Sequence, residues 1–224
     1  MERQNPPPCL VLGGGGHARV LLDSLLSSGT GRPVAVLDED RSLWGKELMG
    51  VPVKGGDDLI PEFLKQGIRY FVVGLGSVGD NRPRIALFDR AIAHGLTPLT
   101  VRHPSAICSR WATVGAGSVL FPGALVNAGA VIGRNVIVNT GAIVEHECVI
   151  GDHAHISTGA RLASTVKIGR AAHIGIGSTI RQCLSVGEGA IVGAGAVVIK
   201  DVKPWTVMVG VPAEPLRVTG TVAR

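Results

Sequence analysis

A six-residue period in the second half of the chain constrains the fold more than any other feature. Stepping by six from Val114, every position as far as Val198 is aliphatic. The fifteen positions are Val114, Leu120, Val126, Ile132, Val138, Val144, Ile150, Ile156, Leu162, Ile168, Ile174, Ile180, Val186, Val192 and Val198. Strands of a sandwich are irregularly spaced, whereas stacked repeats keep an unbroken phase. The period therefore predicts a parallel β-helix built from hexapeptides.

The first hundred residues follow a different pattern, in which strand and helix signals alternate. "CLVLGG" and "PVAVLDED" are typical of buried strands, and "HARVLLDSLLSSG" between them is typical of an amphipathic helix that ends at a glycine. "RYFVVGLG" predicts a later strand and "NRPRIALFDRAIAHG" a later helix. This alternation predicts a Rossmann-like α/β domain over residues 1–104. The β-helix then occupies residues 105–224 with a short C-terminal tail.

Four glycines separate the first predicted strand from the first predicted helix in "VLGGGGHARV". Gly13, Gly15 and Ala18 satisfy the dinucleotide pattern G-x-G-x-x-A, and Asp38 follows at about the usual twenty-residue distance. Backbone N–H groups at such a helix start bind phosphate in any nucleotide. From this motif alone, a dinucleotide-dependent dehydrogenase and a phosphate site for other chemistry both stay open.

Charge and composition limit the classes of ligand and partner that the chain can bind. The net charge of +5 and the pI near 9.3 favour anionic ligands, while 4% aromatic residues and the lack of a Lys/Arg run argue against nucleic acid. Four cysteines without paired spacing suggest neither a metal site nor a disulfide framework, which fits a cytoplasmic protein. The N-terminus has no apolar signal segment. Residues 111–133 are uncharged, but recurring glycine, proline and asparagine exclude a membrane span.

The repeat resembles the left-handed β-helix of hexapeptide-repeat acyltransferases, in which three hexapeptides make one triangular coil. This resemblance implies about five coils, a homotrimer, and acetyl-CoA bound between neighbouring subunits. His155 and His173 are three hexapeptides apart, so they are expected to stack on successive coils. Because each precedes an inward aliphatic residue, we expect both side chains to point outward.

The segment "VEHECVIG" places His146 between Glu145 and Glu147. Acyl transfer from a thioester needs a base near neutral pH, a group that orients it, and donors for the developing oxyanion. Histidine beside a carboxylate meets the first two needs, and no Ser or Cys nucleophile is required.

Several segments together are similar to the bacterial nucleotide-sugar acetyltransferases, a group that includes UDP-4-amino-sugar and GDP-perosamine N-acetyltransferases and sialic-acid O-acetyltransferases. They are "GGGGHARV", "LDED", "VGDNRPR", "NTGAIVEHECVIGDHAHISTGA" and "VGVPAEPLR", and they extend over nearly the whole chain. The resemblance implies that His146 is the catalytic base and that Glu147 increases its basicity. Asn139 would then lie near the reacting amine, and His155, Ile176 and Ala194 would contact acetyl-CoA.

The resemblance also assigns the glycine loop to the acceptor substrate. Gly15, Gly16 and His17 are expected at the pyrophosphate and sugar, Asp38 and Glu39 at the nucleoside, and Gly79 beneath it. Within the family's acidic pair, the second position here is a glutamate, so its contact can be longer or lost. No loop interrupts the repeat, so a neighbouring chain would have to close the site.

The sequence therefore predicts an acetyl-CoA-dependent N-acetyltransferase that acts on a nucleotide-linked amino sugar in glycan biosynthesis, without a metal. A sialic-acid-type O-acetyltransferase is the main alternative, since it would use the same residues. A non-catalytic nucleotide-binding trimer and a dehydrogenase also remain. The sequence does not identify the nucleotide, the sugar or the position of the amine.

Overall fold

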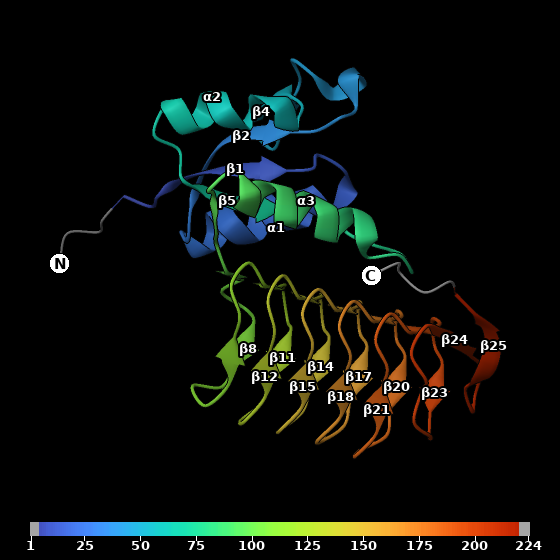
Figure 1. Cartoon of the computed structure of the whole chain (residues 1–224). Coiled ribbons are helices and arrows are strands. Elements are labelled where there is room, and N and C mark those ends of the chain that lie inside the picture. The colour runs from blue at the N-terminus through green and yellow to red at the C-terminus, as the bar shows by residue number, and fades with distance from the viewer. Residues whose placement is uncertain (1–4, 220–224) are drawn as a thin grey trace. The chain divides into compact units, whose positions relative to one another are not determined.

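The computed structural model describes residues 5–219, which form two compact units (Figure 1). The first contains residues up to Gly76 together with Pro83–Pro104, and the second contains Ser77–Arg82 together with the chain from Ser105 onward. The short segment Ser77–Arg82 thus belongs by its contacts to the second unit. Over residues 5–219, none of the helices combines the length and the apolar character needed to cross a bilayer.

The first unit is an α/β fold around a mostly parallel sheet of order β3-β4-β2-β1-β5-β6, in which only β3 is antiparallel to its neighbour. Its strands are β1 (Pro8–Leu12), β2 (Arg32–Leu37), β3 (Glu47–Leu48), β4 (Val51–Gly55), β5 (Tyr70–Val73) and β6 (Thr97–Pro98). The short strand β7 (Val101–Arg102) is not part of this sheet. Its helices are α1 (Gly16–Ser28), α2 (Ile60–Lys65) and α3 (Arg82–Ala93), with 3-10 turns η1 (Arg41–Leu43) and η2 (Asp57–Leu59).

Strand order in this sheet reverses at β1, which pairs with β2 on one side and β5 on the other. In open α/β sheets, ligands bind outside the carboxyl ends of the strands at such a reversal. The core beneath is apolar, and Phe71 of β5 packs against Phe88 of α3 with ring centroids 5.5 Å apart. The Rossmann-like α/β fold expected from the sequence is confirmed.

The second unit is a β-helix of two-residue strands on three parallel sheets (Figure 1). The strands are β8 (Ile107–Cys108), β9 (Thr113–Val114), β10 (Val119–Leu120), β11 (Leu125–Val126), β12 (Val131–Ile132), β13 (Ile137–Val138), β14 (Ile143–Val144), β15 (Val149–Ile150), β16 (His155–Ile156), β17 (Arg161–Leu162), β18 (Lys167–Ile168), β19 (His173–Ile174), β20 (Thr179–Ile180), β21 (Ser185–Val186), β22 (Ile191–Val192) and β23 (Val197–Val198). The hairpin of β24 (Thr206–Val209) and β25 (Glu214–Val218) follows, and β24 pairs with β22.

The predicted inward positions form the core of this unit. All of them from Leu120 to Val198 are buried in one apolar cluster, and Val114 packs partly buried against it. The series of inward positions begins six residues earlier than the sequence indicated, because Cys108 of β8 also packs against the cluster. Each strand pairs in register with the equivalent strand of the next coil, so His155 faces His173 directly. The left-handed β-helix expected from the resemblance is confirmed.

A second six-residue series sets the turns. Every sixth residue from Gly117 to Gly195 has a positive φ. Eight of these positions are glycines and six are not, namely Asn135, Glu147, His153, Thr165, Ala171 and Cys183. Because side-chain-bearing residues adopt this left-handed conformation at a cost, the exceptions mark positions where a side chain has been kept despite strain.

Candidate active site

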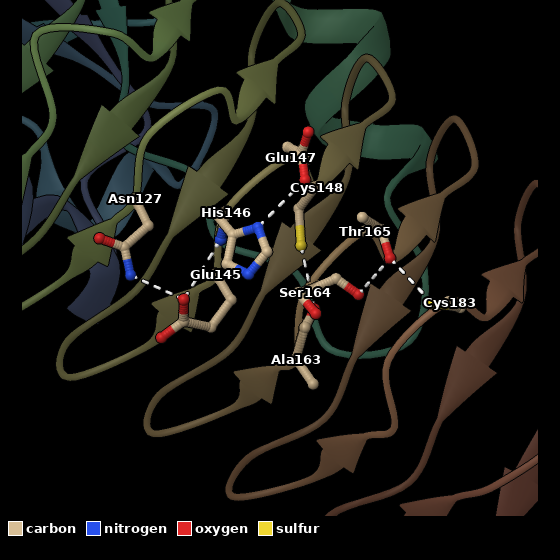
Figure 2. Close-up of polar contacts among 9 residues, drawn as sticks. All are labelled: Asn127, Glu145, His146, Glu147, Cys148, Ala163, Ser164, Thr165 and Cys183. Carbon is tan, nitrogen blue, oxygen red and sulfur yellow. Dashed lines mark hydrogen bonds and ion pairs between the residues drawn. The ribbon is translucent and has the colours of Figure 1, made fainter.

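His146 and Glu147 form a direct pair at the turn after β14 (Figure 2). His146 Nδ1 lies 3.2 Å from Glu147 Oε2, and the two side chains are 54% and 67% exposed. A carboxylate only accepts, so the neutral imidazole donates its Nδ1 proton and presents the lone pair of Nε2. In this tautomer His146 can act as a base, and its exposed side chain can be reached from outside the prism.

Glu147 occupies one of the strained turn positions, with φ of 59°. Gly129 is the equivalent residue of the preceding coil, and a Cβ atom there would lie 3.2 Å from Glu147 Cγ. The glycine therefore leaves room for the carboxylate side chain. Backbone strain retained at a residue that contacts a candidate base favours a functional role for Glu147.

Glu145 supports the same turn from the other side (Figure 2). Its Oε2 accepts a hydrogen bond of 2.8 Å from Asn127 Nδ2 and one of 3.2 Å from the His146 backbone N–H. The sequence singled out this acid only as a neighbour of His146. Its partner Asn127 is the equivalent residue of the preceding coil, so the repeat could have indicated the contact.

Asn139, His155 and Ser77 form a second chain of hydrogen bonds in this unit. His155 Nδ1 lies 3.0 Å from the carbonyl oxygen of Ser77, which can only accept, so Nδ1 carries the proton. Nε2 then accepts from Asn139 Nδ2 at 3.1 Å. Asn139 Oδ1 accepts from the Thr140 backbone N–H at 2.8 Å, which fixes the direction of the amide. These contacts select one tautomer of the His155 imidazole.

His155 and His173 stack as expected but are not exposed to solvent. Their rings meet edge to face with centroids 5.0 Å apart, and the residues are only 5% and 7% exposed. The segment Ser77–Arg82 accounts for the cover of His155, since Asn81 Nδ2 also donates to the carbonyl of Ala171 at 2.8 Å. Alternation along the strand gave the direction of the side chains, but it could not show which segment packs on them.

Ile176 and Ala194 occupy equivalent positions on successive coils. The backbone N–H of Gly195 donates to the Ile176 carbonyl at 2.8 Å, and both side chains are exposed, Ile176 by 62%. They belong to the column of turns that also contains Pro122, Thr140 and Thr158, and Thr140 follows Asn139 directly. This exposed edge of small or apolar side chains and turn backbone fits an extended ligand arm.

Asn139 lies in the turn before the short strand β14, and His146 lies in the turn after it. They therefore occupy different corners of the coil. Within one chain the structure brings together His146 with Glu147, and Asn139 with His155, but it places these two groups at separate corners.

The glycine loop of the first unit has the backbone geometry of a phosphate site. Gly13 has a φ of 97°, and a Cβ atom there would lie 3.1 Å from the Leu75 backbone nitrogen. Gly15 is the N-cap of α1, and its first turn carries no acidic residue. Among the described residues, nothing lies within 4 Å of a Cβ built at Gly15 or Gly16. The start of α1 is therefore open to an anion.

His17 is packed into the unit rather than extended from it. A Cβ atom at Gly76 would lie 3.1 Å from the His17 ring. Burial, together with the positive charge of Arg84, lowers the pKa of His17 to about 4. The imidazole is therefore neutral near pH 7 and can offer a phosphate one N–H at most.

Asp38 anchors the glycine loop. Its Oδ2 accepts from the Gly14 backbone N–H at 2.6 Å, and its Oδ1 accepts from that of Asp40 at 2.7 Å. Glu39 beside it is largely exposed and pairs with Arg90 at 3.2 Å. Gly79, with φ of 77°, lies in the segment Ser77–Arg82, which belongs to the second unit.

Comparison with known proteins identifies both parts of the chain. The model of the PglD N-terminal domain matches residues 9–91, and that of the bacterial transferase hexapeptide (six repeats) matches residues 129–164. No curated protein sequence matches significantly.

Solved structures extend the likeness to nearly the whole chain. PerB from Caulobacter crescentus, in complex with CoA and GDP-perosamine, is 36% identical with a TM-score of 0.86, over 93% of this chain and 96% of its own. The acetyltransferase domain of PglB from Neisseria gonorrhoeae, in complex with acetyl coenzyme A, is 37% identical with a TM-score of 0.86, over 94% and 100%. The protein belongs to the hexapeptide-repeat family of bacterial nucleotide-sugar N-acetyltransferases, and it is an acetyltransferase.

Proposed function

We propose that the chain transfers an acetyl group from acetyl-CoA to the amino group of a nucleotide-linked amino sugar. The observation that carries the proposal is the exposed pair of His146 and Glu147 at 3.2 Å. The bound molecules of the neighbours support both substrates, since PerB holds CoA with GDP-perosamine and the PglB domain holds acetyl-CoA. Two further neighbour structures are perosamine N-acetyltransferase mutants in which a histidine is replaced by asparagine or alanine.

In the proposed reaction His146 acts as a general base. Glu147 accepts a hydrogen bond from the Nδ1–H of His146 and so holds the tautomer in which Nε2 is basic. As the amine nitrogen attacks the thioester carbonyl, Nε2 takes the proton that the nitrogen loses. The C–S bond then breaks, CoA leaves with its sulfur electron pair, and protonation gives the free thiol. The acetyl group passes directly to the amine, with no acyl-enzyme intermediate.

We assign Asn139 to the acceptor amine and His155, Ile176 and Ala194 to acetyl-CoA. Because Nε2 of His155 accepts from Asn139, His155 contributes to this region by fixing the amide and by its ring surface. The corner that carries Asn139 and the corner that carries His146 are separated within one coil. A homotrimer in which the two corners come from neighbouring subunits would complete the site.

The first unit is proposed to hold the nucleotide. The open backbone at Gly15 and Gly16, at the start of α1, would bind the pyrophosphate, with the neutral His17 beside it. Glu39 is exposed enough to reach a ribose, while Asp38 acts mainly on the loop through its two backbone hydrogen bonds. Gly79 would lie beneath the nucleotide sugar.

Thiol release from acetyl-CoA tests the reaction against a panel of UDP-, GDP- and dTDP-amino sugars and free sialic acid. We expect turnover with an amino sugar and not with sialic acid. His146→Ala should lower kcat by roughly 100-fold or more, the magnitude of a lost general base. Full activity of His146→Ala would refute the base, and turnover of sialic acid alone would indicate the O-acetyltransferase.

Subunit complementation tests the shared site. Homo-oligomers of His146→Ala and of Asn139→Ala should each be impaired, and refolding the two together should restore part of the activity, because some interfaces then carry both native corners. Activity that never exceeds that of the two separate variants would contradict a site between subunits.

A further inference from the structure

A cavity of about 360 Å³ opens in the first unit beyond the carboxyl ends of its strands. Gly13 and Asp38 line it, so the cavity adjoins the glycine loop that carries the proposed phosphate site. One wall is apolar and includes Leu37, Leu75 and Leu87. An apolar wall beside a loop proposed to bind phosphate suits the face of a nucleobase.

The polar part of the lining carries a fixed ion pair. Arg90 of α3 donates from Nη1 to Asp57 Oδ2 at 2.8 Å and to Glu39 Oε1 at 3.2 Å. The Asp57 side chain is 6% exposed, whereas that of Arg90 is 48% exposed. Burial raises the pKa of Asp57, and Arg90 opposes this effect. Because water barely reaches this carboxylate, any further hydrogen-bond donor that contacts it would stabilise its charged form.

The neighbouring carboxylates are less suited to reading a base. Both oxygens of Asp38 already accept backbone N–H groups, and the Glu39 side chain is 77% exposed. Among the described residues, Asp57 is the acid that lines this cavity, is nearly buried and is held by a cation from a neighbouring helix. The polar edge of a base in the cavity would meet this pair.

We propose that Asp57 and Arg90 read the nucleobase and select guanine, so that the acceptor is a guanosine diphosphate sugar. This inference rests on the proposed function, because it refines the substrate of the same site. The hydrogen-bonding pattern of the pair carries the choice of base. Arg90 is a donor at every polar atom, and ionised Asp57 is an acceptor at both oxygens.

Guanine alone among the bases places two donors, N1–H and N2–H₂, side by side, with the acceptors O6 and N7 beyond them. A carboxylate can accept both donors, while a guanidinium can donate to O6 and N7. Uracil and thymine have a single N3–H with a carbonyl oxygen on each side, and these oxygens would repel Asp57. Adenine has one amino group between two acceptors, so it satisfies one carboxylate oxygen only.

Nucleotide binding measured by calorimetry on the intact protein tests the assignment without any acetyl transfer. The probes are GDP, ADP, UDP and inosine diphosphate, which differs from GDP only by lacking the 2-amino group. A hydrogen bond to a charged group predicts that inosine diphosphate binds about 10- to 100-fold more weakly than GDP. UDP and ADP should also bind more weakly than GDP.

The variant Asp57→Asn should remove this discrimination, so that GDP and inosine diphosphate bind within about 3-fold of each other. Asp89→Asn is the matched control, because Asp89 is an exposed acid next to Arg90 that does not line the cavity. It should keep the native preference. A circular-dichroism melting curve shows whether Asp57→Asn is folded. If the variant does not fold, the relative affinities of the native protein for GDP, inosine diphosphate, ADP and UDP still test the proposal.

The proposal is overturned if UDP or ADP binds the native protein as tightly as GDP, if GDP and inosine diphosphate are equivalent, or if no nucleotide binds. A failure of the proposed function is a different result. In that case GDP binds with the predicted preference, yet no GDP-amino sugar releases thiol from acetyl-CoA.

Discussion

The pKa of His17 predicts a pH-dependent loss of stability in the first unit. His17 lies against Gly76, and burial with the nearby charge of Arg84 lowers its pKa from 6.5 to about 4. The unfolded chain therefore binds a proton at His17 more readily than the folded chain between these values. The contribution of His17 to the free energy of unfolding is therefore fully present above about pH 6.5. It is lost progressively as the pH falls toward 4. Substituting glutamine, which does not titrate, removes this term.

The magnitude follows from the two pKa values. Between about pH 7.5 and pH 5, proton binding to the unfolded state should reduce the free energy of unfolding by about 2 kcal/mol through His17 alone. Other groups also titrate over this range. The quantity of interest is therefore the difference between the native protein and His17→Gln at each pH, in which the shared contributions cancel.

Hydrogen–deuterium exchange of peptides from β1 (Pro8–Leu12) and β5 (Tyr70–Val73) reports the opening free energy of this unit. The stability advantage of the native protein over His17→Gln should shrink by about 2 kcal/mol from pH 7.5 to pH 5. A native-to-variant difference that stays constant with pH would refute the reasoning.

Further substitutions test other parts of the structure. Gly13→Ala should weaken nucleotide binding and destabilise the first unit, because the φ of 97° and the 3.1 Å approach to the Leu75 backbone nitrogen exclude a Cβ atom. Gly15→Ala should have a much smaller effect on both. Calorimetry measures the binding and melting curves measure the stability. Ile156→Ala should cost about 2–5 kcal/mol in denaturant unfolding, since it empties a fully buried position of the prism. Gly129→Ala should lower kcat more than it raises KM, because a methyl group would press on Glu147 Cγ; an unchanged kcat would contradict the role given to that carboxylate.

The parts predictable from sequence are those that local periodicity controls. The inward positions from Val114 onward and the stacking of His155 on His173 follow from the hexapeptide period and from the coil of three hexapeptides. The strand and helix pattern around the glycine loop follows from the alternation of strand and helix signals. The pairing of His146 with Glu147 was also accessible, because adjacent residues at a turn are close in any fold.

Contacts between distant segments could not be predicted in this way. Ser77 meets His155 across 78 residues, and Arg90 meets Asp57 across 33, with no period that relates either pair. The burial of His155 depends on the first of these contacts. The second provides an ion pair in the lining of the cavity, which no local pattern in the sequence indicated.

In the β-helix, the candidate catalytic groups stand where the repeat is not followed. The regular coil needs an aliphatic residue inside and favours glycine at each left-handed turn, and neither residue type performs acid–base chemistry. Glu147 replaces a turn glycine, and Asn135 and His153, at two other such turns, contact each other at 3.0 Å. Each replacement costs backbone strain that glycine would avoid. Because the prism holds these backbones in place through every neighbouring coil, it can sustain the strain and keep Glu147 in register with His146.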